Sequence, residues 1–403
     1  MAEHEEPRRG RVALGVTGSV AGCKAAELTS RLVRSGVDVR VLMTGRAARL
    51  VAPATFATLS RHPVAASLRD EAGLGLEALA STTDLFVVAP ATADCLAKMA
   101  RGLADDPVTA FARLHRGPVL VAPSMDPHVW LHAATQANRQ RLVERGVRFV
   151  EAGPGRVPGG EAGPGDLAAV EQLVEQVHVQ LAAGGEAGRR LRLLVTAGPT
   201  REAIDPVRFL SNRSSGKMGY AVAGVAAAAG HAVTLVSGPS ALPTPLLCRR
   251  IDVTSAAEMA QAVKAEFPAC DALVMAAAVA DYRPRAAAGH KLHKADGPLT
   301  IELERTEDIL ESVAPARRPD QRVMGFAAET DRLLANARAK LLRKRLDWVV
   351  ANDVSRADIG FGADENQVVV LSPDGEERLP RMSKVDLAAR LVAIIAQSLD
   401  APR

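Results

Sequence analysis

The sequence predicts an α/β protein built from two doubly wound, Rossmann-like domains, each with three layers. Apolar segments of about four to eight residues alternate with Ala- and Leu-rich helical segments, and several end in turns that contain glycine or proline. The 403 residues are too many for one core. An apolar content of 48% with only 3% aromatic residues is typical of cores made from small aliphatic side chains.

Charge and cysteine content exclude several classes of protein. The net charge of +4 is small, and no basic run is interleaved with aromatic residues as a nucleic-acid surface requires. Cys23, Cys95, Cys248 and Cys270 lie far apart without metal-ligand spacing, so we expect reduced thiols and no metal site made by a side-chain cluster. No apolar run reaches the roughly 18 residues of a membrane span. The sequence therefore predicts a cytoplasmic protein without membrane or nucleic-acid partners.

The first half opens with a predicted strand in residues 11–21 that ends in a Gly/Ser turn at Gly18 and Ser19. A helix over residues 24–35 and a strand over residues 37–44 follow. This order predicts a nucleotide-binding fold with phosphate at the helix N-terminus. The turn lacks a full Gly-x-Gly-x-x-Gly, so the motif alone is a weak signal.

Two further strands, over residues 85–89 and 119–122, each end in a loop that contains proline. Because the carboxyl ends of parallel strands share one edge of the sheet, we expect these loops to line one pocket. A helix over residues 167–181 precedes a small, Gly-rich, charged stretch with the composition of a flexible linker. We therefore predict domains over residues 1–181 and 191–403, with a linker over residues 182–190.

Four motifs of the first half resemble, in order and spacing, the FMN-binding cysteine decarboxylase fold of the two-domain coenzyme A biosynthesis flavoproteins. They are residues 15–19, 89–93, 123–125 and 153–165. The resemblance implies a flavodoxin-like fold, FMN-dependent oxidation of a substrate thiol, and loss of carbon dioxide. If FMN is retained, the resemblance places it against Gly18, Ser19, Val20, Thr44, Thr92 and Ala93.

The catalytic residues of that family are replaced in this chain. Its histidine falls at Leu76, its asparagine at Asp126 and its reducing cysteine at Gly159. A carboxylate lacks the N–H donors of an amide, and neither leucine nor glycine supplies a base or a thiol. We interpret the nearby His62 and His128 as surface or packing residues. The sequence therefore predicts that the first half is not a decarboxylase.

The second half begins with a predicted strand over residues 193–196. A polar segment, residues 211–219, precedes a helix over residues 218–229 that Gly230 ends. The hydroxyls, cations and glycines of this segment suit an anion at the helix N-terminus, whereas a polar loop that only caps the helix is the alternative. Strands over residues 233–236, 272–276 and 348–351 complete a second doubly wound sheet, and we expect Asn352 and Asp353 in a loop at its carboxyl edge.

Almost all of the second half resembles the phosphopantothenate–cysteine ligase domain of the same flavoproteins. The matching motifs are residues 196–202, 205–208, 211–219, 275–283 and 351–355. One departure is Thr306, where the family often has asparagine. The resemblance implies that CTP, with Mg²⁺ on its triphosphate, activates a carboxylate as an acyl-cytidylate. The amine of cysteine then displaces CMP, and the simplest acid is 4′-phosphopantothenate.

The resemblance also assigns site residues. Asn212 holds the acyl-cytidylate during amine attack, and Lys291 stabilises the α-phosphate. Lys340 and Lys344 lie four residues apart on one predicted helix face and can reach one triphosphate, although a solvated charged face is the ordinary explanation of an isolated pair. The implied nucleotide site comprises Met275, Ala276, Ala277, Asp281, Lys291, Glu307, Asp308, Ile309, Leu310, Phe326, Lys340 and Lys344.

These residues predict an active CTP-dependent acid–amine ligase joined to a flavin-type domain that lacks decarboxylase residues. The resemblance also implies a homo-oligomer. Three alternatives stay open: a related enzyme that joins another acid or amine in secondary metabolism, a fully bifunctional decarboxylase and ligase, and a non-catalytic flavin-binding regulator. Intact Asn212 and Lys291 argue against the regulator.

Overall fold

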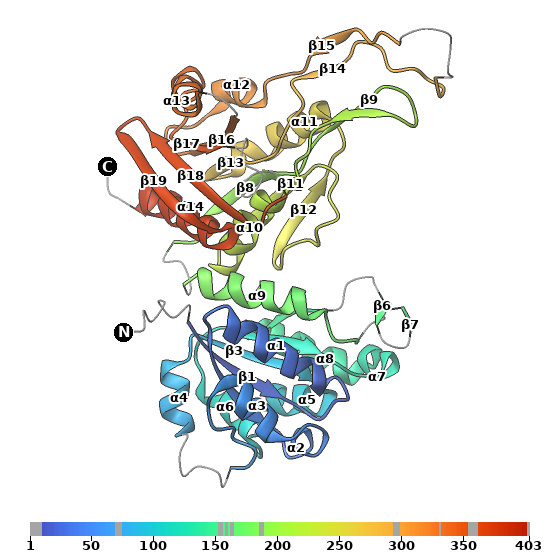
Figure 1. Cartoon of the computed structure of the whole chain (residues 1–403), viewed down its shortest axis with the longest axis vertical. Coiled ribbons are helices and arrows are strands. Elements are labelled where there is room, and N and C mark those ends of the chain that lie inside the picture. The colour runs from blue at the N-terminus through green and yellow to red at the C-terminus, as the bar shows by residue number, and fades with distance from the viewer. Residues whose placement is uncertain are drawn as a thin grey trace. The chain divides into compact units, whose positions relative to one another are not determined.

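The computed structural model describes residues 10–68, 75–151, 156–157, 160–161, 165–184, 189–292, 299–329, 332–353 and 362–400 (Figure 1). The chain divides into two compact units, residues 1–185 and 186–403, and each contains its own central sheet. The boundary between the units falls inside the Gly-rich stretch that has the composition of a linker.

The first unit is a parallel five-stranded sheet in the order β2-β1-β3-β4-β5, with a small β6-β7 hairpin beside it. Its strands are β1 (Arg11–Val16), β2 (Asp38–Met43), β3 (Leu85–Ala91), β4 (Val119–Pro123), β5 (Arg148–Phe149), β6 (Arg156–Val157) and β7 (Gly160–Glu161). Its helices are α1 (Gly22–Arg34), α2 (Ala47–Leu50), α3 (Pro53–Ser60), α4 (Leu76–Thr82), α5 (Ala93–Arg101), α6 (Pro107–Leu114), α7 (Pro127–Leu131), α8 (Ala133–Glu144) and α9 (Val170–Ala182).

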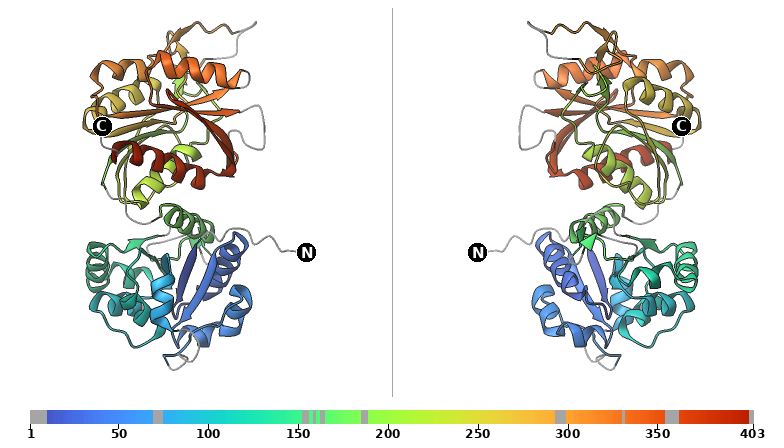
Figure 2. Two further views of the ribbon diagram at one scale, coloured as in Figure 1. Left: turned by 90° about the vertical axis from the view of Figure 1, so that its left-hand side faces the viewer. Right: turned by 90° about the vertical axis from the view of Figure 1, so that its right-hand side faces the viewer.

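Helices cover both faces of this sheet, as the flavodoxin-like prediction requires. Helix α1 packs against α3 and α9, whereas α5 packs against α6 and α8 (Figure 2). The side chains of α5, α6 and α8 bury an apolar cluster against the sheet. The cluster includes Phe86 and Phe111, whose ring centroids lie 4.9 Å apart. The central strand β3 is apolar and buried along its whole length because both faces of a parallel sheet are covered. The carboxyl edge is left for loops, where the flavin residues are predicted.

The second unit holds an eight-stranded sheet in the order β12-β11-β8-β13-β16-β17-β18-β19, with two hairpins, β9-β10 and β14-β15, outside it. Its strands are β8 (Arg192–Ala197), β9 (Arg201–Ala203), β10 (Phe209–Ser211), β11 (Ala232–Ser237), β12 (Cys248–Asp252), β13 (Ala272–Met275), β14 (Tyr282–Pro284), β15 (Leu303–Arg305), β16 (Arg322–Glu329), β17 (Trp348–Asp353), β18 (Glu365–Ser372) and β19 (Gly375–Ser383). Its helices are α10 (Lys217–Ala228), α11 (Ala256–Glu266), α12 (Ile309–Val313), α13 (Leu333–Arg343) and α14 (Lys384–Asp400), with short 3₁₀ turns η2 (Phe267–Ala269) and η3 (Ala314–Ala316).

The second sheet confirms the doubly wound prediction and extends it. The six strands β12, β11, β8, β13, β16 and β17 are parallel, and β18 and β19 add two antiparallel strands at one edge. Helices α10 and α14 pack together on one face, and α11, α12 and α13 bury an apolar cluster on the other. The loop predicted at Asn352 and Asp353 is wrong, because both residues continue β17 and pair with β16. Pairing with a neighbouring strand overrides the weak strand propensity of Asn-Asp.

Helix α10 lies unusually close to β8 at Gly219. A Cβ atom on Gly219 would stand 2.6 Å from the Cβ of Ala197 and 2.8 Å from the carbonyl oxygen of Thr196. We expect Gly219→Ala to lower the free energy of unfolding of this domain by about 1–3 kcal/mol, although alanine ordinarily favours a helix. Urea unfolding followed by Trp348 fluorescence in a Trp130→Phe background would measure the change.

Gly375→Ala is the matched control for this substitution, because a Cβ there meets no atom within 4 Å. Equal unfolding midpoints for the two variants would contradict a tight contact between α10 and β8.

Candidate active site

The loop after β13 is fixed to the turn after β8 at the carboxyl edge of the second sheet. The buried hydroxyl of Thr196 accepts a hydrogen bond from the Ala277 N–H (3.1 Å), and that of Thr200 accepts one from the Ala280 N–H (3.0 Å). Both threonines therefore hold the loop of residues 276–281 at the edge where open α/β sheets bind ligands.

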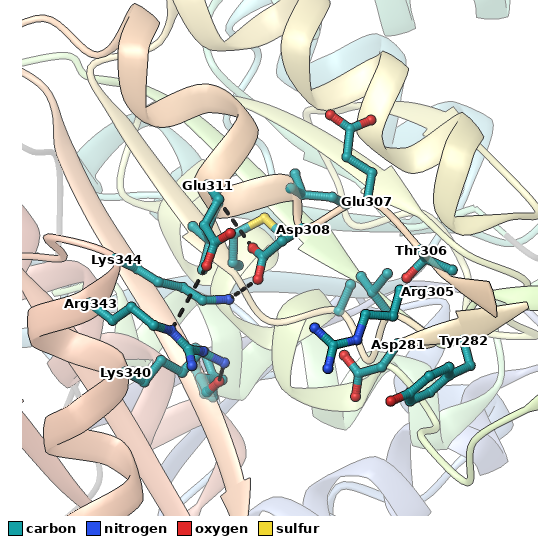
Figure 3. A pocket seen from close by; sticks show the side chains of 16 residues that line it. Asp281, Tyr282, Arg305, Thr306, Glu307, Asp308, Glu311, Lys340, Arg343 and Lys344 are labelled. Carbon is teal, nitrogen blue, oxygen red and sulfur yellow. Dashed lines mark hydrogen bonds and ion pairs between the residues drawn. The ribbon is translucent and has the colours of Figure 1, made fainter.

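A cavity of about 560 Å³, here called the first cavity, opens beside this loop. Its volume is within the range of small-molecule sites. Figure 3 shows acidic side chains from α12 and the segment before it facing basic side chains from the end of α13. The lining residues are Met275, Ala277, Val279, Asp281, Tyr282, Arg305, Thr306, Glu307, Asp308, Ile309, Leu310, Glu311, Phe326, Lys340, Arg343 and Lys344.

The structure gathers most of the predicted nucleotide set around the first cavity. Ten of the twelve predicted residues line it, namely Met275, Ala277, Asp281, Glu307, Asp308, Ile309, Leu310, Phe326, Lys340 and Lys344. Ala276 and Lys291 are not among the lining residues. Contact with a nucleotide stays a prediction for the whole set.

Several basic side chains of the first cavity already have partners. The Lys344 ammonium donates to the Asp308 carboxylate, and Lys340 donates to the Phe326 carbonyl (2.6 Å). Arg343 lies 3.8 Å from Glu311. Helix α13 ends at Arg343, so Lys344 occupies the cap position, and its side chain is only 9% exposed. The predicted lysine pair is therefore not a solvated face, because both ammonium groups are held inside the cavity wall.

Asp308 remains an anion in this wall. Burial alone would raise the pKa of its carboxyl group. The hydrogen bonds from Lys344 and from the Glu311 N–H (3.3 Å), together with the ammonium charges of Lys344 and Lys340, outweigh burial and lower that pKa. The wall of the first cavity thus carries both acidic and basic side chains, and the Asp308 carboxylate positions the Lys344 ammonium.

Asn212 connects the polar segment after β10 to the first cavity. Its Nδ2 donates to the Ala278 carbonyl, and its Oδ1 accepts from the Ser214 N–H (3.0 Å). The neighbours of Ala278, Ala277 and Val279, both line the first cavity. Two hydrogen bonds therefore hold the Asn212 side chain against Ala278, a residue whose two neighbours line the first cavity.

The polar segment itself borders a second cavity of about 470 Å³. Its walls come from the turn after β8, from β9 and β10, and from the loop after β11. The lining residues are Pro199, Arg201, Phe209, Ser211, Asn212, Arg213, Ser214, Ser215, Pro239, Ser240, Ala241 and Leu242. Residues 239–242 were not predicted, and the Gly-Pro turn at the end of β11 was the only signal for them.

The capping interpretation of the polar segment holds only in part. Gly216, at φ +79°, is the N-cap residue of α10 and has no side chain with which to cap it. The hydroxyls of Ser214 and Ser215 accept long bonds from the N–H groups of Gly216 (3.3 Å) and Lys217 (3.5 Å). Local bonds therefore shape the turn, and anion binding at the start of α10 stays a prediction.

Lys291 is exposed and lines neither cavity. The next residue, Leu292, donates its N–H to the buried carboxylate of Asp205 (3.1 Å) and accepts from Arg208 through its carbonyl (3.0 Å). Asp205 also accepts from the N–H groups of Val207 and Arg208, both at 2.7 Å. The structure thus anchors the segment that carries Lys291 on the turn between β9 and β10.

Six residues of the first cavity were not among the predicted nucleotide-site residues: Val279, Tyr282, Arg305, Thr306, Glu311 and Arg343. Most are immediate neighbours of predicted residues, and the two arginines extend the basic character of the wall. At the carboxyl end of β17, the Oδ1 atom of Asn352 is buried without a hydrogen-bond partner in the described part of the chain. An unpaired buried acceptor costs about 1–3 kcal/mol.

In the first unit, the loops at the carboxyl edge are joined by hydroxyl groups. Thr17 donates to the Pro90 carbonyl (2.7 Å) and accepts from the Thr92 N–H (3.0 Å), and the hydroxyls of Ser19 and Ser124 lie 2.8 Å apart. The predicted flavin residues Gly18, Ser19, Val20, Thr44, Thr92 and Ala93 all lie in or beside these loops. Their contact with flavin stays a prediction.

Two of the three positions predicted to replace decarboxylase residues, Leu76 and Asp126, make structural contacts. Leu76 begins α4 and packs against the apolar cluster between the sheet and α5, α6 and α8. Asp126 is the N-cap of α7 and accepts from the His128 N–H (2.8 Å). Gly159 lies outside the described residues. His62 bonds to Asp38 (3.0 Å) at the start of β2, away from the carboxyl edge.

In the described ranges, no group of three histidine, cysteine, aspartate or glutamate side chains is arranged to hold a metal ion. None of the helices in those ranges is long and apolar enough to cross a membrane.

Comparison with known proteins assigns each half to a family. Residues 1–182 match the flavoprotein family, and residues 188–399 match the family described as the DNA/pantothenate metabolism flavoprotein C-terminal domain. Together with the two doubly wound units, these matches define a two-domain flavoprotein of pantothenate metabolism. The chain belongs to the family of bifunctional coenzyme A biosynthesis proteins, CoaBC, and its second domain corresponds to the ligase half.

The similarity extends along nearly the whole chain. The chain is 42% identical to the coenzyme A biosynthesis bifunctional protein CoaBC of Vibrio cholerae, over 96% of this chain and 98% of the relative. It is also 42% identical to the Bacillus subtilis protein of that name, over 96% of each chain. A crystal structure of the C-terminal domain of a CoaBC protein is 41% identical and covers 53% of this chain and 97% of its own, with a TM-score of 0.45.

Proposed function

We propose that the second domain is a CTP-dependent ligase that joins the carboxylate of 4′-phosphopantothenate to the amine of cysteine. The observation that carries the proposal is the connection between Asn212 and the first cavity through Ala278. It places a fixed amide beside a small-molecule cavity whose wall contains Arg305, Lys340 and Lys344.

The reaction proceeds in two balanced steps. A carboxylate oxygen attacks the α-phosphorus of CTP, forms the acyl–O–P bond and releases pyrophosphate. The cysteine nitrogen then attacks the acyl carbon, the C–O bond breaks, CMP leaves with the bonding electrons, and the amine loses a proton. Neither step needs a covalent enzyme nucleophile, so positioning and charge compensation supply the catalysis.

The residues of the first cavity suit the nucleotide. Lys340, Lys344 and Arg343 compensate phosphate charge, and the backbone of the loop at residues 276–281 forms a rigid wall for the base and ribose. Mg²⁺ enters bound to the triphosphate. Phosphate oxygens are its main ligands.

Asn212 acts on the acyl-cytidylate. Its amide can donate to the acyl oxygen and accept from the attacking amine, and its loop is held by Ser214. Lys291 stabilises the α-phosphate in this proposal. Its segment is bound to Asp205 outside the lining of the first cavity, so it must move toward that cavity when substrate binds.

Pyrophosphate release from a panel of acids and amines tests the ligase directly. With CTP, Mg²⁺, 4′-phosphopantothenate and cysteine, we expect pyrophosphate and CMP in equal amounts. The same assay with ATP in place of CTP is the specificity control. Turnover with another acid or amine, and none with this pair, would support the alternative of a related enzyme of secondary metabolism. No turnover with any pair would support a non-catalytic protein.

For the first domain we propose flavin binding without decarboxylation. Leu76 is part of the packing of α4, and the Asp126 carboxylate is occupied as a helix cap, so neither provides the family's base or amide. We expect no carbon dioxide from 4′-phosphopantothenoylcysteine supplied to purified, FMN-loaded protein. Trapping of ¹⁴C-labelled carbon dioxide is the measurement, and release in stoichiometric amounts would establish the bifunctional alternative that the relatives' name suggests.

A further inference from the structure

Arg46 lies on the turn that follows β2, at the N-cap of α2, and packs against Gly18 on the turn that follows β1. A Cβ atom on Gly18 would stand 2.5 Å from the Cγ of Arg46 and 2.7 Å from its Cδ. The aliphatic part of the arginine therefore occupies the place of a Gly18 side chain. Any larger residue at position 18 would push Arg46 away from the turn.

The Arg46 guanidinium is exposed and makes no hydrogen bond or ion pair to any residue in the described part of the chain. The N–H groups of Gly18 and Val20 likewise donate to no described residue. Helix α1 begins just after this turn, with no acidic residue in its first turn and no side-chain bond from its N-cap residue, Ala21. The turn thus combines free donors, a helix N-terminus and an unpaired cation.

Such a donor set fits a phosphate group. The first domain belongs to a flavoprotein family, and FMN differs from riboflavin only by its 5′-phosphate. Arg46 was not among the predicted flavin residues, and it reaches this turn because glycine at position 18 leaves room for its aliphatic carbons.

We propose that Arg46 binds the 5′-phosphate of FMN and makes the first domain selective for FMN over riboflavin. This proposal rests on flavin binding by the first domain and is independent of ligase activity. It adds a cation to the predicted contacts of Gly18, Ser19 and Val20, which supply mainly backbone N–H groups.

Flavin fluorescence quenching tests the proposal on the flavin-free, full-length chain. We expect Arg46→Ala to weaken FMN binding by about tenfold or more, the usual effect of losing a charge-assisted contact, and to leave riboflavin binding unchanged. Arg46→Lys should recover part of the loss. Arg49→Ala is the matched control, because it removes the same charge from an exposed position on α2, the short helix that Arg46 caps.

Each other result overturns the proposal. Equal loss of FMN and riboflavin would show that Arg46 supports the turn or the ring site. Unchanged or tighter FMN binding by Arg46→Ala would show that the arginine is not a phosphate ligand. Equal weakening of FMN binding by Arg46→Ala and Arg49→Ala would show that only the net charge of the chain matters. A wild-type chain that binds neither flavin would also remove the proposed flavin binding, whereas the other outcomes leave it intact.

Discussion

Asn212→Asp is expected to stop amide formation while pyrophosphate release continues for about one turnover per site. The substitution replaces the donor that reaches the Ala278 carbonyl with a carboxylate oxygen, so two acceptors face each other. The acyl oxygen of the intermediate loses its donor as well. Loss of a single preorganised donor of this kind typically costs about 10²–10³ in rate.

Rapid quench and separation of the nucleotides would show the result as an acyl-cytidylate that accumulates with no amide product. Gln261→Glu makes the same amide-to-acid change at an exposed position on α11 and should keep full turnover. Wild-type turnover by Asn212→Asp would refute the assigned role. Loss of both pyrophosphate and amide would show that the loop, rather than the chemistry, depends on Asn212.

Lys344→Met is expected to raise the KM for CTP by about 10- to 100-fold. The ammonium is nearly buried in the wall of the first cavity, and its removal leaves the half-buried Asp308 carboxylate without its main partner. The remaining acid then repels phosphate.

Because the pKa of Asp308 is lowered in the native protein, this pair stabilises the fold above the ordinary pKa of aspartate, and the contribution is lost as the pH falls through the lowered value.

Steady-state kinetics over a range of CTP concentrations, with acid and amine saturating, would measure the effect. Lys264→Met is the control, since Lys264 is exposed and pairs with Glu307 of the same cavity from outside. We expect it to change the KM for CTP by less than about threefold. Similar kinetic effects of the two variants would show that Lys344 contributes only general charge.

Ten of the twelve residues that the family resemblance assigns to the nucleotide site line the first cavity. Parallel topology explains the position of Met275 at the carboxyl end of β13, whereas Asp308 reaches the cavity as the N-cap of α12. Local spacing likewise predicted α10 within one residue at each end, including the role of Gly230, which has φ +91°.

The remaining parts depend on contacts that no local pattern encodes. The position of Lys291 is set by two hydrogen bonds of Leu292, which donates to Asp205 and accepts from Arg208, both more than 80 residues away in the chain. The extension of β17 to Asp353 is set by its pairing with β16. Arg46 was missed because its relation to Gly18 is a steric one between two separate loops.

Positions 76 and 126 of the first domain, which are predicted to replace decarboxylase residues, also differ in how easily a substitution could restore the family's residue. Asparagine caps a helix about as well as aspartate, so position 126 could regain an amide with little change in the stability of α7. Leu76 has become part of the apolar packing, and a histidine there would place a polar ring against that cluster at a cost of roughly 1–3 kcal/mol. Apolar packing therefore opposes the return of histidine at position 76, whereas helix capping does not oppose the return of asparagine at position 126.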